Sequence, residues 1–204
     1  MRRLLSLSLL AVCGAASAYD FDYTANGQVP LADLGSATLD LPVVDARLIA
    51  TLEVGVIVTH TWQGDVNLLI RDPLGLSHAL TSRPGQPQTT FGFSDDDFGN
   101  SATGGEMFFT DLGASIYDDP PVPAPGINQV TGNWLAEGGS LNAAFAGRSL
   151  NGTWHLDAND NAGGDVGTLL RVHIRGTVRP VPEPASMAVL GLGAVALLRR
   201  RLRK

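Results

Sequence analysis

Residues 47–75, RLIATLEVGVIVTHTWQGDVNLLIRDPLG, carry the clearest structural signal in the chain. Between residues 47 and 61, apolar side chains recur at every second position, which is the period of a β-strand with one buried face. Residues 63–65 interrupt the run, residues 66–71 resume it, and residues 72–75 match a β-turn with proline in its second position. The stretch therefore predicts two consecutive strands that pair as a hairpin.

The sequence on either side of this stretch has the same character. Glycine and proline are frequent, with 24 and 12 residues among 204, and no long stretch has the period of an amphipathic helix. Residues 152–158 and 168–178 alternate again, and strict alternation in the second places Leu169 on the same face as Arg171. Short strands separated by turns predict an all-β sandwich or barrel. We expect one domain at residues 40–179, preceded by a lead-in at residues 19–39.

The first 18 residues have the order of an export signal. Two arginines are followed by an apolar run at residues 4–12 and by Ala16-Ser17-Ala18, which fits a cleavage site. The alternative is a buried first helix. We predict a signal peptide at residues 1–18 and an exported mature protein. Cys13 is the only cysteine in the chain, so the mature domain would contain no disulfide and no thiolate site.

The C-terminal residues form a second terminal segment. Residues 181–184, VPEP, precede an apolar run at residues 185–198, and a basic cluster ends the chain. A spanning helix usually needs about 20 apolar residues, but flanking residues and arginines that reach the headgroups extend a shorter run. The positive-inside rule keeps the basic cluster cytoplasmic and the body outside. We predict a short hydrophobic helix outside the fold that inserts transiently into the membrane, with an ordinary C-terminal anchor as the alternative.

The charge distribution divides the chain in the same way. The body at residues 19–184 carries all 20 acidic residues but only seven of the 14 basic ones, a net charge of −13 against −6 for the whole chain. Binding to phosphates needs clustered lysines and arginines, so the acidic body argues against nucleic acid as a partner. It is compatible with cation binding or simply with solubility.

Three stretches of the body, taken together, resemble the P/Homo B domain. This β-sandwich follows the catalytic domain of subtilisin-like proprotein convertases and also occurs in bacterial secreted proteins. The stretches are VTHTWQGDV at residues 58–66, FSDD at residues 93–96, and NGTWHL at residues 151–156 with GD at 164–165 and GTL at 167–169. The resemblance implies a jelly-roll-like β-sandwich. A tryptophan that the family often has after the last motif is absent here, which alters packing of the final strand.

The resemblance also bears on function. The catalytic domain of the family needs several hundred residues, for which this chain has no room, so a stand-alone, non-enzymatic P domain is implied. One alternative is an accessory or stabilising subunit of a subtilisin-like protease made as a separate protein.

The last 25 residues, 180–204, resemble a PEP-CTERM sorting signal. In that family an exosortase, a membrane protease, cuts near the Pro-Glu-Pro sequence and releases or re-anchors the protein at the surface. The two prolines keep the segment extended before the apolar run. The residues that match the sorting motif are Pro182, Glu183, Pro184, Arg199, Arg200 and Arg201.

Acidic residues gather in two glycine-rich loops. Asp95, Asp96 and Asp97 are adjacent, and Asp160 and Asp165 lie in the second loop. Adjacent like charges are costly unless a cation or solvent offsets them, and oxygen ligands on short side chains suit Ca²⁺. The resemblance adds that P domains of bacterial proteases can bind structural calcium. We predict a structural Ca²⁺ site at these residues, with solvated turn-capping aspartates as the alternative.

Catalytic and carbohydrate sites have weaker signals. A catalytic role for His60 and Asp65, with Ser82 or Ser94 as nucleophile, would need a motif such as G-x-S-x-G, and none occurs. We therefore expect His60 to be structural and the protein not to be an enzyme. Trp134 is the candidate for a carbohydrate platform, whereas Trp62 and Trp154 are expected to pack within the fold. The sequence thus predicts an exported surface or matrix protein, with a protease accessory subunit and a carbohydrate-binding matrix component as alternatives. The predicted partners are an exosortase and either a subtilisin-like protease or an extracellular polysaccharide.

Overall fold

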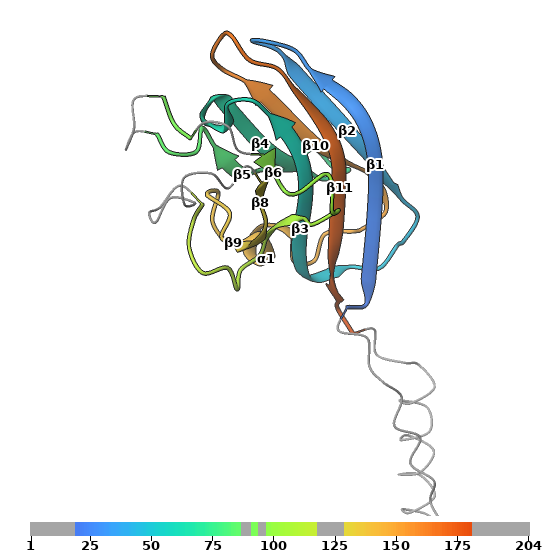
Figure 1. Cartoon of the computed structure of the whole chain (residues 1–204). Coiled ribbons are helices and arrows are strands. Elements are labelled where there is room, and N and C mark those ends of the chain that lie inside the picture. Colours follow the sequence, from blue (N-terminus) through green and yellow to red (C-terminus); the bar gives the residue numbers. More distant parts are fainter. Residues whose placement is uncertain (1–18, 87–90, 94–96, 118–128, 181–204) are drawn as a thin grey trace, which may run out of the picture.

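Two β-sheets pack face to face (Figure 1). The computed structural model describes residues 19–86, 91–93, 97–117 and 129–180. Within these ranges the larger sheet has seven strands, ordered β1-β11-β3-β6-β8 with β7 and β9 joined through β3, and the smaller has four, ordered β2-β10-β4-β5. The prediction of an all-β sandwich is confirmed.

The bounds of the elements are as follows. The larger sheet contains β1 (Phe21–Leu31), β3 (Ile49–His60), β6 (Asp97–Phe98), β7 (Met107–Phe109), β8 (Gln129–Val130), β9 (Gly132–Trp134) and β11 (Gly167–Val178). The smaller contains β2 (Ser36–Val43), β4 (Val66–Arg71), β5 (Ser77–Ser82) and β10 (Gly152–Asp160). The helical elements are the 3₁₀ turn η1 (Gln63–Asp65) and α1 (Leu141–Phe145). In the described ranges, no helix combines the length and the apolar character that crossing a membrane requires.

The core lies between the sheets because each inner face presents apolar side chains at every second position. In β2 the buried residues are Ala37, Leu39, Leu41 and Val43, and those between them are exposed. Trp154 of β10 heads the fully buried side chains in size, and its ring lies 5.4 Å from that of Phe145 in α1, centroid to centroid. Burial of each large aliphatic side chain contributes about 1.5–3 kcal/mol to stability.

The sandwich begins earlier than the lead-in at residues 19–39 anticipates. Strand β1 and the first part of β2 fall within that segment, and β1 pairs along its length with β11. Its pattern is weak because β1 is an edge strand, where Pro30 is tolerated. The register shifts between Asn26 and Val29, and a Cβ on Gly27 would lie 2.6 Å from Leu39 Cδ1. Gly27 therefore lets the irregular part of β1 approach the other sheet.

The predicted hairpin of residues 47–61 with residues 66–71 is wrong, although both segments are strands. Strand β3 pairs with β11, whereas β4 pairs with β10 and β5 in the other sheet. The turn between them, η1, is buried and carries the chain across the sandwich. The turn at residues 72–75 does form, with Gly75 N donating to Asp72 O at 3.0 Å, and it joins β4 to β5 as a hairpin.

The final strand also departs from simple alternation. The pairing of β11 with β3 shifts between Leu169 and Arg171, so Leu170 is the extra residue of a β-bulge. Leu169 is therefore fully buried in the core with Val172 and Ile174, and does not share the outer face of Arg171.

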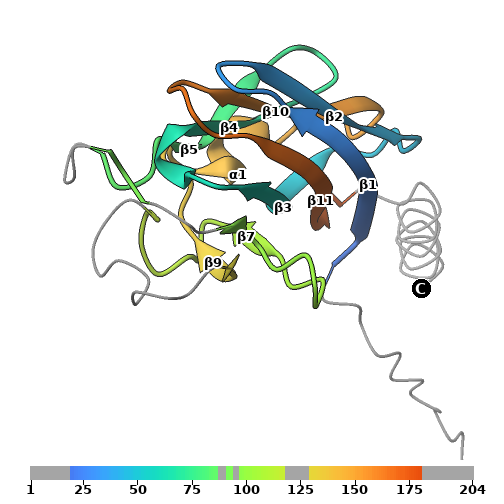
Figure 2. The ribbon, with the colours of Figure 1, turned by 45° about the horizontal axis from the view of Figure 1, so that its top comes forward.

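The two ends of the sandwich differ in what they carry. Asp20 N donates to Gly176 O at 2.8 Å and Val178 N donates to the Asp20 carboxylate at 2.9 Å, so the first and last described strands meet there. We call this the tail end, formed by residues 43–48, 72–75, 147–152 and 178–180. The opposite loop end is formed by residues 32–35, 61–65, 91–93 and 160–167. At about 3.3 Å per residue, the 12-residue strand β11 separates the two ends by roughly 40 Å. Figures 1 and 2 show β1, β3 and β11 running side by side between the two ends.

Candidate functional site

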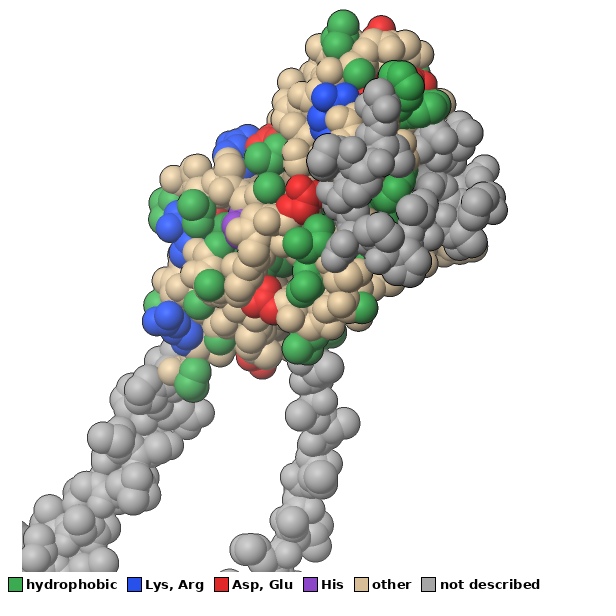
Figure 3. Space-filling model, turned by 90° about the vertical axis from the view of Figure 1, so that its left-hand side faces the viewer, with side chains coloured by type: hydrophobic (Ala, Val, Ile, Leu, Met, Phe, Trp, Pro, Cys, Tyr) green, Lys and Arg blue, Asp and Glu red, His purple; other side chains and the backbone are tan. Residues whose placement is uncertain are grey.

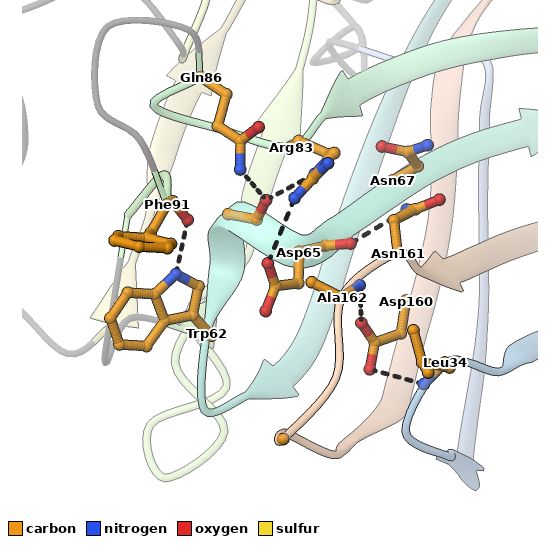
Figure 4. A network of polar contacts seen from close by, with 12 residues as sticks. Leu34, Trp62, Asp65, Asn67, Arg83, Gln86, Phe91, Asp160, Asn161 and Ala162 are labelled. Carbon is orange, nitrogen blue, oxygen red and sulfur yellow. Dashed lines mark hydrogen bonds and ion pairs between the residues drawn. The ribbon is translucent and has the colours of Figure 1, made fainter.

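The turn at residues 60–65 is the centre of the loop end (Figure 4). Gly64 N donates to Phe93 O at 2.9 Å, and Trp62 Nε1 donates to Phe91 O at 2.6 Å. A Cβ on Gly64 would lie 2.4 Å from Phe91 O, so only glycine allows this approach. Residues 91–93 are thereby held directly against the turn.

The loop between β10 and β11 is attached to the same turn. Asn161 donates to Asp65 O from its backbone N at 2.8 Å and from Nδ2 at 3.0 Å. Thr61 Oγ1 donates to Asp165 Oδ1 at 2.6 Å. Of the three stretches that resemble the P/Homo B domain, residues 60–65, Phe93 and Asp165 therefore meet at this turn, whereas residues 151–156 begin β10 at the tail end.

The described members of the predicted metal set surround this turn, but each carboxylate already caps a backbone or hydroxyl group. Asp97 Oδ1 accepts from His60 N at 3.0 Å. Asp160 accepts from Leu34 N at 3.3 Å with one oxygen and from Ala162 N at 3.2 Å with the other. In the described ranges, no group of three or more His, Cys, Asp or Glu side chains is arranged to hold a metal.

The other two predicted ligands, Asp95 and Asp96, lie outside the described residues. The same holds for the six residues of the predicted sorting motif. The calcium site therefore stays a prediction. The described carboxylates of this set act as turn caps, and Asp165 accepts a hydrogen bond from Thr61 Oγ1.

Asp65 is partly neutralised by a strained arginine. Arg83 has a φ of 51°, an unfavourable left-handed conformation for a residue with a side chain. Its Nη2 lies 3.6 Å from Asp65 Oδ1 and its Nε donates to Gly64 O at 3.2 Å. Burial raises the pKa of Asp65, and the Asp160 charge raises it further. Burial also raises the pKa of Asp97.

His60 is enclosed beneath the turn. Its ring Nδ1 lies 2.7 Å from Trp62 O and 3.1 Å from Trp62 N. Its Nε2 is 3.6 Å from Asp160 Oδ2, and both side chains have 0% exposure. Among the described serines, Ser82 is not its partner, because Ser82 Oγ donates to Asn67 Oδ1 at 3.1 Å. The ring holds the turn in place and faces no open cleft.

The three tryptophans have different environments. Trp154 is buried and donates from Nε1 to Leu150 O at 3.0 Å, as expected for a packing residue. Trp134 is half-buried, with its ring 5.0 Å from that of Tyr117. Trp62 is also half-buried, at the loop end beside Phe91, which is 68% exposed. The sequence therefore misplaced Trp62, whose strand-like context hid its position in a surface turn.

A concave site lies apart from the loop end, beside α1. It encloses about 430 Å³, and its lining includes Asp111, Glu137 and Ser140. Asp111 accepts from Leu141 N at 2.8 Å, and Glu137 accepts from Ser82 N at 2.8 Å. Both carboxylates are thus engaged in capping α1 and the edge strand β5.

A charged cluster on the outer face of the larger sheet centres on His173. Nδ1 of His173 lies 2.7 Å from Glu106 Oε2, and its Nε2 lies 2.9 Å from Asp22 Oδ1. Burial alone lowers the pKa of His173, but the two carboxylates outweigh it and hold the pKa above its ordinary value of 6.5. Burial alone raises the pKa of Glu106, but His173 and Arg171 bring it below 4.5.

These shifts predict a pH-dependent stability. The raised pKa of His173 contributes stability that is present below about pH 6.5 and is lost as the pH rises through the folded-state pKa. The lowered pKa of Glu106 contributes stability that is lost as the pH falls below about 4.5. We expect the melting temperature to fall from pH 6 upward in wild type, and the fall to be weaker in His173→Gln.

The matched control is His155→Gln. His155 pairs with Asp40, whose side chain is 63% exposed, so this pair contributes little. The pH slope of His155→Gln should equal that of wild type. An unchanged slope in His173→Gln would contradict the assignment.

Comparison with known proteins identifies the tail but not the domain. No curated protein matches the sequence. A crystal structure of the serine protease of Aeromonas sobria matches at 14% identity and a TM-score of 0.44, covering 76% of this chain and 26% of that chain. A crystal structure of the A. sobria serine protease (ASP) and chaperone (ORF2) complex matches at 13% identity and the same TM-score and coverage. This chain thus spans only a small part of those chains, and a similarity of this size assigns no function.

The family model described as the PEP-CTERM protein-sorting motif matches residues 180–204. This segment begins two residues after β11 ends. The match agrees with the resemblance seen in the sequence, including the position of the Pro-Glu-Pro stretch. The protein is therefore an exported one, whose C-terminal sorting tail is of the type processed by exosortase at the cell envelope.

Proposed function

We propose that the protein is a non-enzymatic surface or matrix module, a stand-alone domain of the P/Homo B type that exosortase processing delivers to the cell exterior. The observation that carries the proposal is the sorting-motif match at residues 180–204, directly after the last strand of a folded domain. The β-sandwich is the domain that is exported, and the tail is its sorting signal.

The P/Homo B assignment is supported by where parts of its three motifs lie, although residues 151–156 lie away from the turn, at the start of β10. Residues 58–66 supply the turn, residue 93 bonds to it through Gly64, and the segment after β10 bonds to it through Asp65 and Thr61. Motifs that share one local structure are expected to occur together, because each supplies a partner that the others require.

The non-enzymatic assignment is supported by the state of the histidines. His60 is bonded to Trp62, His78 to Gly139 O, His155 to Asp40, and His173 to two carboxylates, and none of these partners is a serine hydroxyl. A general base needs its nucleophile within about 2.6–3.2 Å. Hydrolysis of peptide substrates by the purified protein, abolished by His60→Ala, would overturn this part of the proposal.

The sorting role predicts the outcome of changing Pro182-Glu183-Pro184 to three alanines. We expect the variant to keep its tail and remain with the membrane fraction, because the protease no longer recognises the cleavage region. Mass spectrometry of the C-terminus of the recovered protein measures this directly. Val181→Ala is the matched control and should be processed normally. If the triple variant were processed like wild type, the tail would not be a sorting substrate.

We further propose that residues 95–97 hold a structural Ca²⁺. Because a ligand that binds only the folded state stabilises it by about 2.7 kcal/mol at 100 times Kd, the melting temperature should rise with added Ca²⁺ and fall with EDTA. The double variant Asp95→Asn/Asp96→Asn should lose the response. Asp165→Asn should keep it, since Thr61 engages that carboxylate. A melting temperature indifferent to both Ca²⁺ and EDTA would remove the calcium proposal.

A further inference from the structure

Large apolar side chains are exposed around the point where the chain leaves the domain. Val44 is 95% exposed, Leu74 76% and Leu48 44%. Leu48 O accepts from Arg179 N at 2.8 Å, one residue before the described chain ends. Val44 follows the last residue of β2, and Leu74 occupies the tip of the β4–β5 turn. All three belong to the tail end.

Basic side chains share this end of the molecule. Arg47, Arg148 and Arg179 are three of the seven basic residues of the body. Arg47 is paired with Asp45 at 2.7 Å and Arg148 is paired with Asp72. The tail end is thus close to neutral, although the body as a whole is strongly acidic. Figure 3 shows hydrophobic side chains together with both basic and acidic ones along this lower end of the described domain.

The loop end has the opposite character. It also exposes apolar side chains, with Leu34 66% and Val166 59% exposed. These lie among acidic residues, since Asp160 bonds to Leu34 N and Asp165 precedes Val166. An anionic membrane surface would repel the acidic loop end but would not repel the nearly neutral tail end.

The length of the tail fixes which end can reach a membrane. Only residues 181–184 separate the last described residue, Pro180, from the apolar run that starts at residue 185. An extended chain spans at most about 3.3–3.6 Å per residue, so the tail end lies within roughly 18 Å of that run. The headgroup layer on each side of a bilayer is about 5–7 Å thick. With the apolar run in the bilayer, the point where the chain leaves the tail end therefore lies at most roughly 11–13 Å beyond the headgroup layer, whereas the loop end is the far end of a sandwich roughly 40 Å long.

We propose that the tail end, through Val44, Leu48, Leu74 and Arg179, is a docking surface for the anionic lipid headgroups of the membrane that holds the sorting tail. The aliphatic side chains enter the interface, and Arg179, rather than the ion-paired Arg47 and Arg148, buries its stem while its guanidinium group meets a lipid phosphate. The inference rests on the proposed function, because it requires the tail to be in the membrane. Docking holds Pro182-Glu183-Pro184 at a constant height for processing.

A single-cysteine design tests the docking surface. The chain has one cysteine, Cys13, so the full chain carrying Cys13→Ser accepts a unique fluorescent label at Leu74→Cys. The labelled protein is reconstituted into vesicles of phosphatidylethanolamine and phosphatidylglycerol that contain a headgroup-linked nitroxide quencher. Val166→Cys, at the loop end, is the matched control. Ala194→Cys, inside the apolar run, reports whether the tail has inserted.

The expected result is strong quenching at Leu74→Cys, several-fold greater than at Val166→Cys, together with a membrane environment at Ala194→Cys. Equal quenching at residues 74 and 166 with an inserted tail would overturn the docking surface and leave the sorting role intact. A label at residue 194 that stays in water would show that the tail does not insert. The docking proposal would then be overturned as well, because it requires an inserted tail.

A second variant separates docking from tethering alone. With the label at Val44→Cys, the change Leu74→Asp should reduce quenching because it places a charge on the interface, whereas Val166→Asp should not. Both positions are exposed, so neither change disturbs the core. Unaltered quenching in Leu74→Asp would show that the inserted sorting tail alone keeps the tail end near the membrane, without the docking surface.

Discussion

Replacing Trp154 with alanine is expected to lower the free energy of unfolding by about 3–5 kcal/mol, the usual range for removing a large aromatic side chain from a core. Trp154 is fully buried in β10, packs against Phe145 and donates to Leu150 O. It thereby joins the smaller sheet to α1 and to the segment before β10. The change leaves a cavity at that junction and an unpaired backbone carbonyl.

Urea unfolding of wild type and variant, followed by fluorescence and circular dichroism, measures this loss. Trp134→Ala is the matched control, because Trp134 is half-buried and its removal opens to solvent. It should cost markedly less than Trp154→Ala. Trp154→Phe should recover part of the loss by restoring ring contacts. Equal costs at residues 154 and 134 would show that α1 is not packed on the core as described.

The second large effect is expected for Asp160→Ala, with a loss of about 3 kcal/mol, because removing the buried carboxylate leaves two backbone N–H groups without their acceptor. These donors are Leu34 N and Ala162 N, and Asp160 Oδ2 also lies 3.6 Å from His60 Nε2. In the described residues that nitrogen has no hydrogen-bond partner. One deletion therefore loosens the β1–β2 turn, the β10–β11 loop and the 60–65 turn together.

Thermal unfolding with and without EDTA distinguishes this role from metal binding. Asp160→Ala should be destabilised equally in both conditions, since its oxygens are engaged by backbone donors. Asp165→Ala, which removes only an exposed bond to Thr61, should change stability by less than about 1 kcal/mol. A loss in Asp160→Ala that disappears in EDTA would instead make Asp160 a calcium ligand.

The strands with strong alternation could be predicted from sequence, and the pairing of the strands could not. The segments that became β3, β4, β10 and β11 were recognisable because one face of each is apolar. The crossing of η1 between sheets leaves no local mark, since Gln63-Gly64-Asp65 suits a hairpin turn as well as a buried 3₁₀ turn. The bulge at Leu170 cannot be predicted from the local sequence either, because it depends on the register between β11 and β3. Strand β1 was missed because an edge strand needs less apolar surface.

At the loop end, the sequence correctly marked the acidic loops and the 60–65 turn as special. It could not show that backbone N–H groups donate hydrogen bonds to the carboxylates of Asp97 and Asp160. The donors belong to Leu34, His60 and Ala162, which lie on three separate segments. Nor could it reveal the left-handed conformation of Arg83, which no residue preference predicts. Such tertiary capping is visible only once the chain is folded.

The place of β11 determines when the domain can fold. Export that starts from an N-terminal signal delivers the chain from its first residue onward, so β1 emerges long before β11. Yet β11 lies between β1 and β3, and Phe21 pairs with Gly176 across nearly the whole domain. The larger sheet therefore stays open until the final strand has crossed, and contacts of such long sequence separation form slowly. The apolar run follows a few residues later. The larger sheet therefore cannot close until all but the sorting tail of the chain has crossed, and closure then competes in time with insertion of that tail.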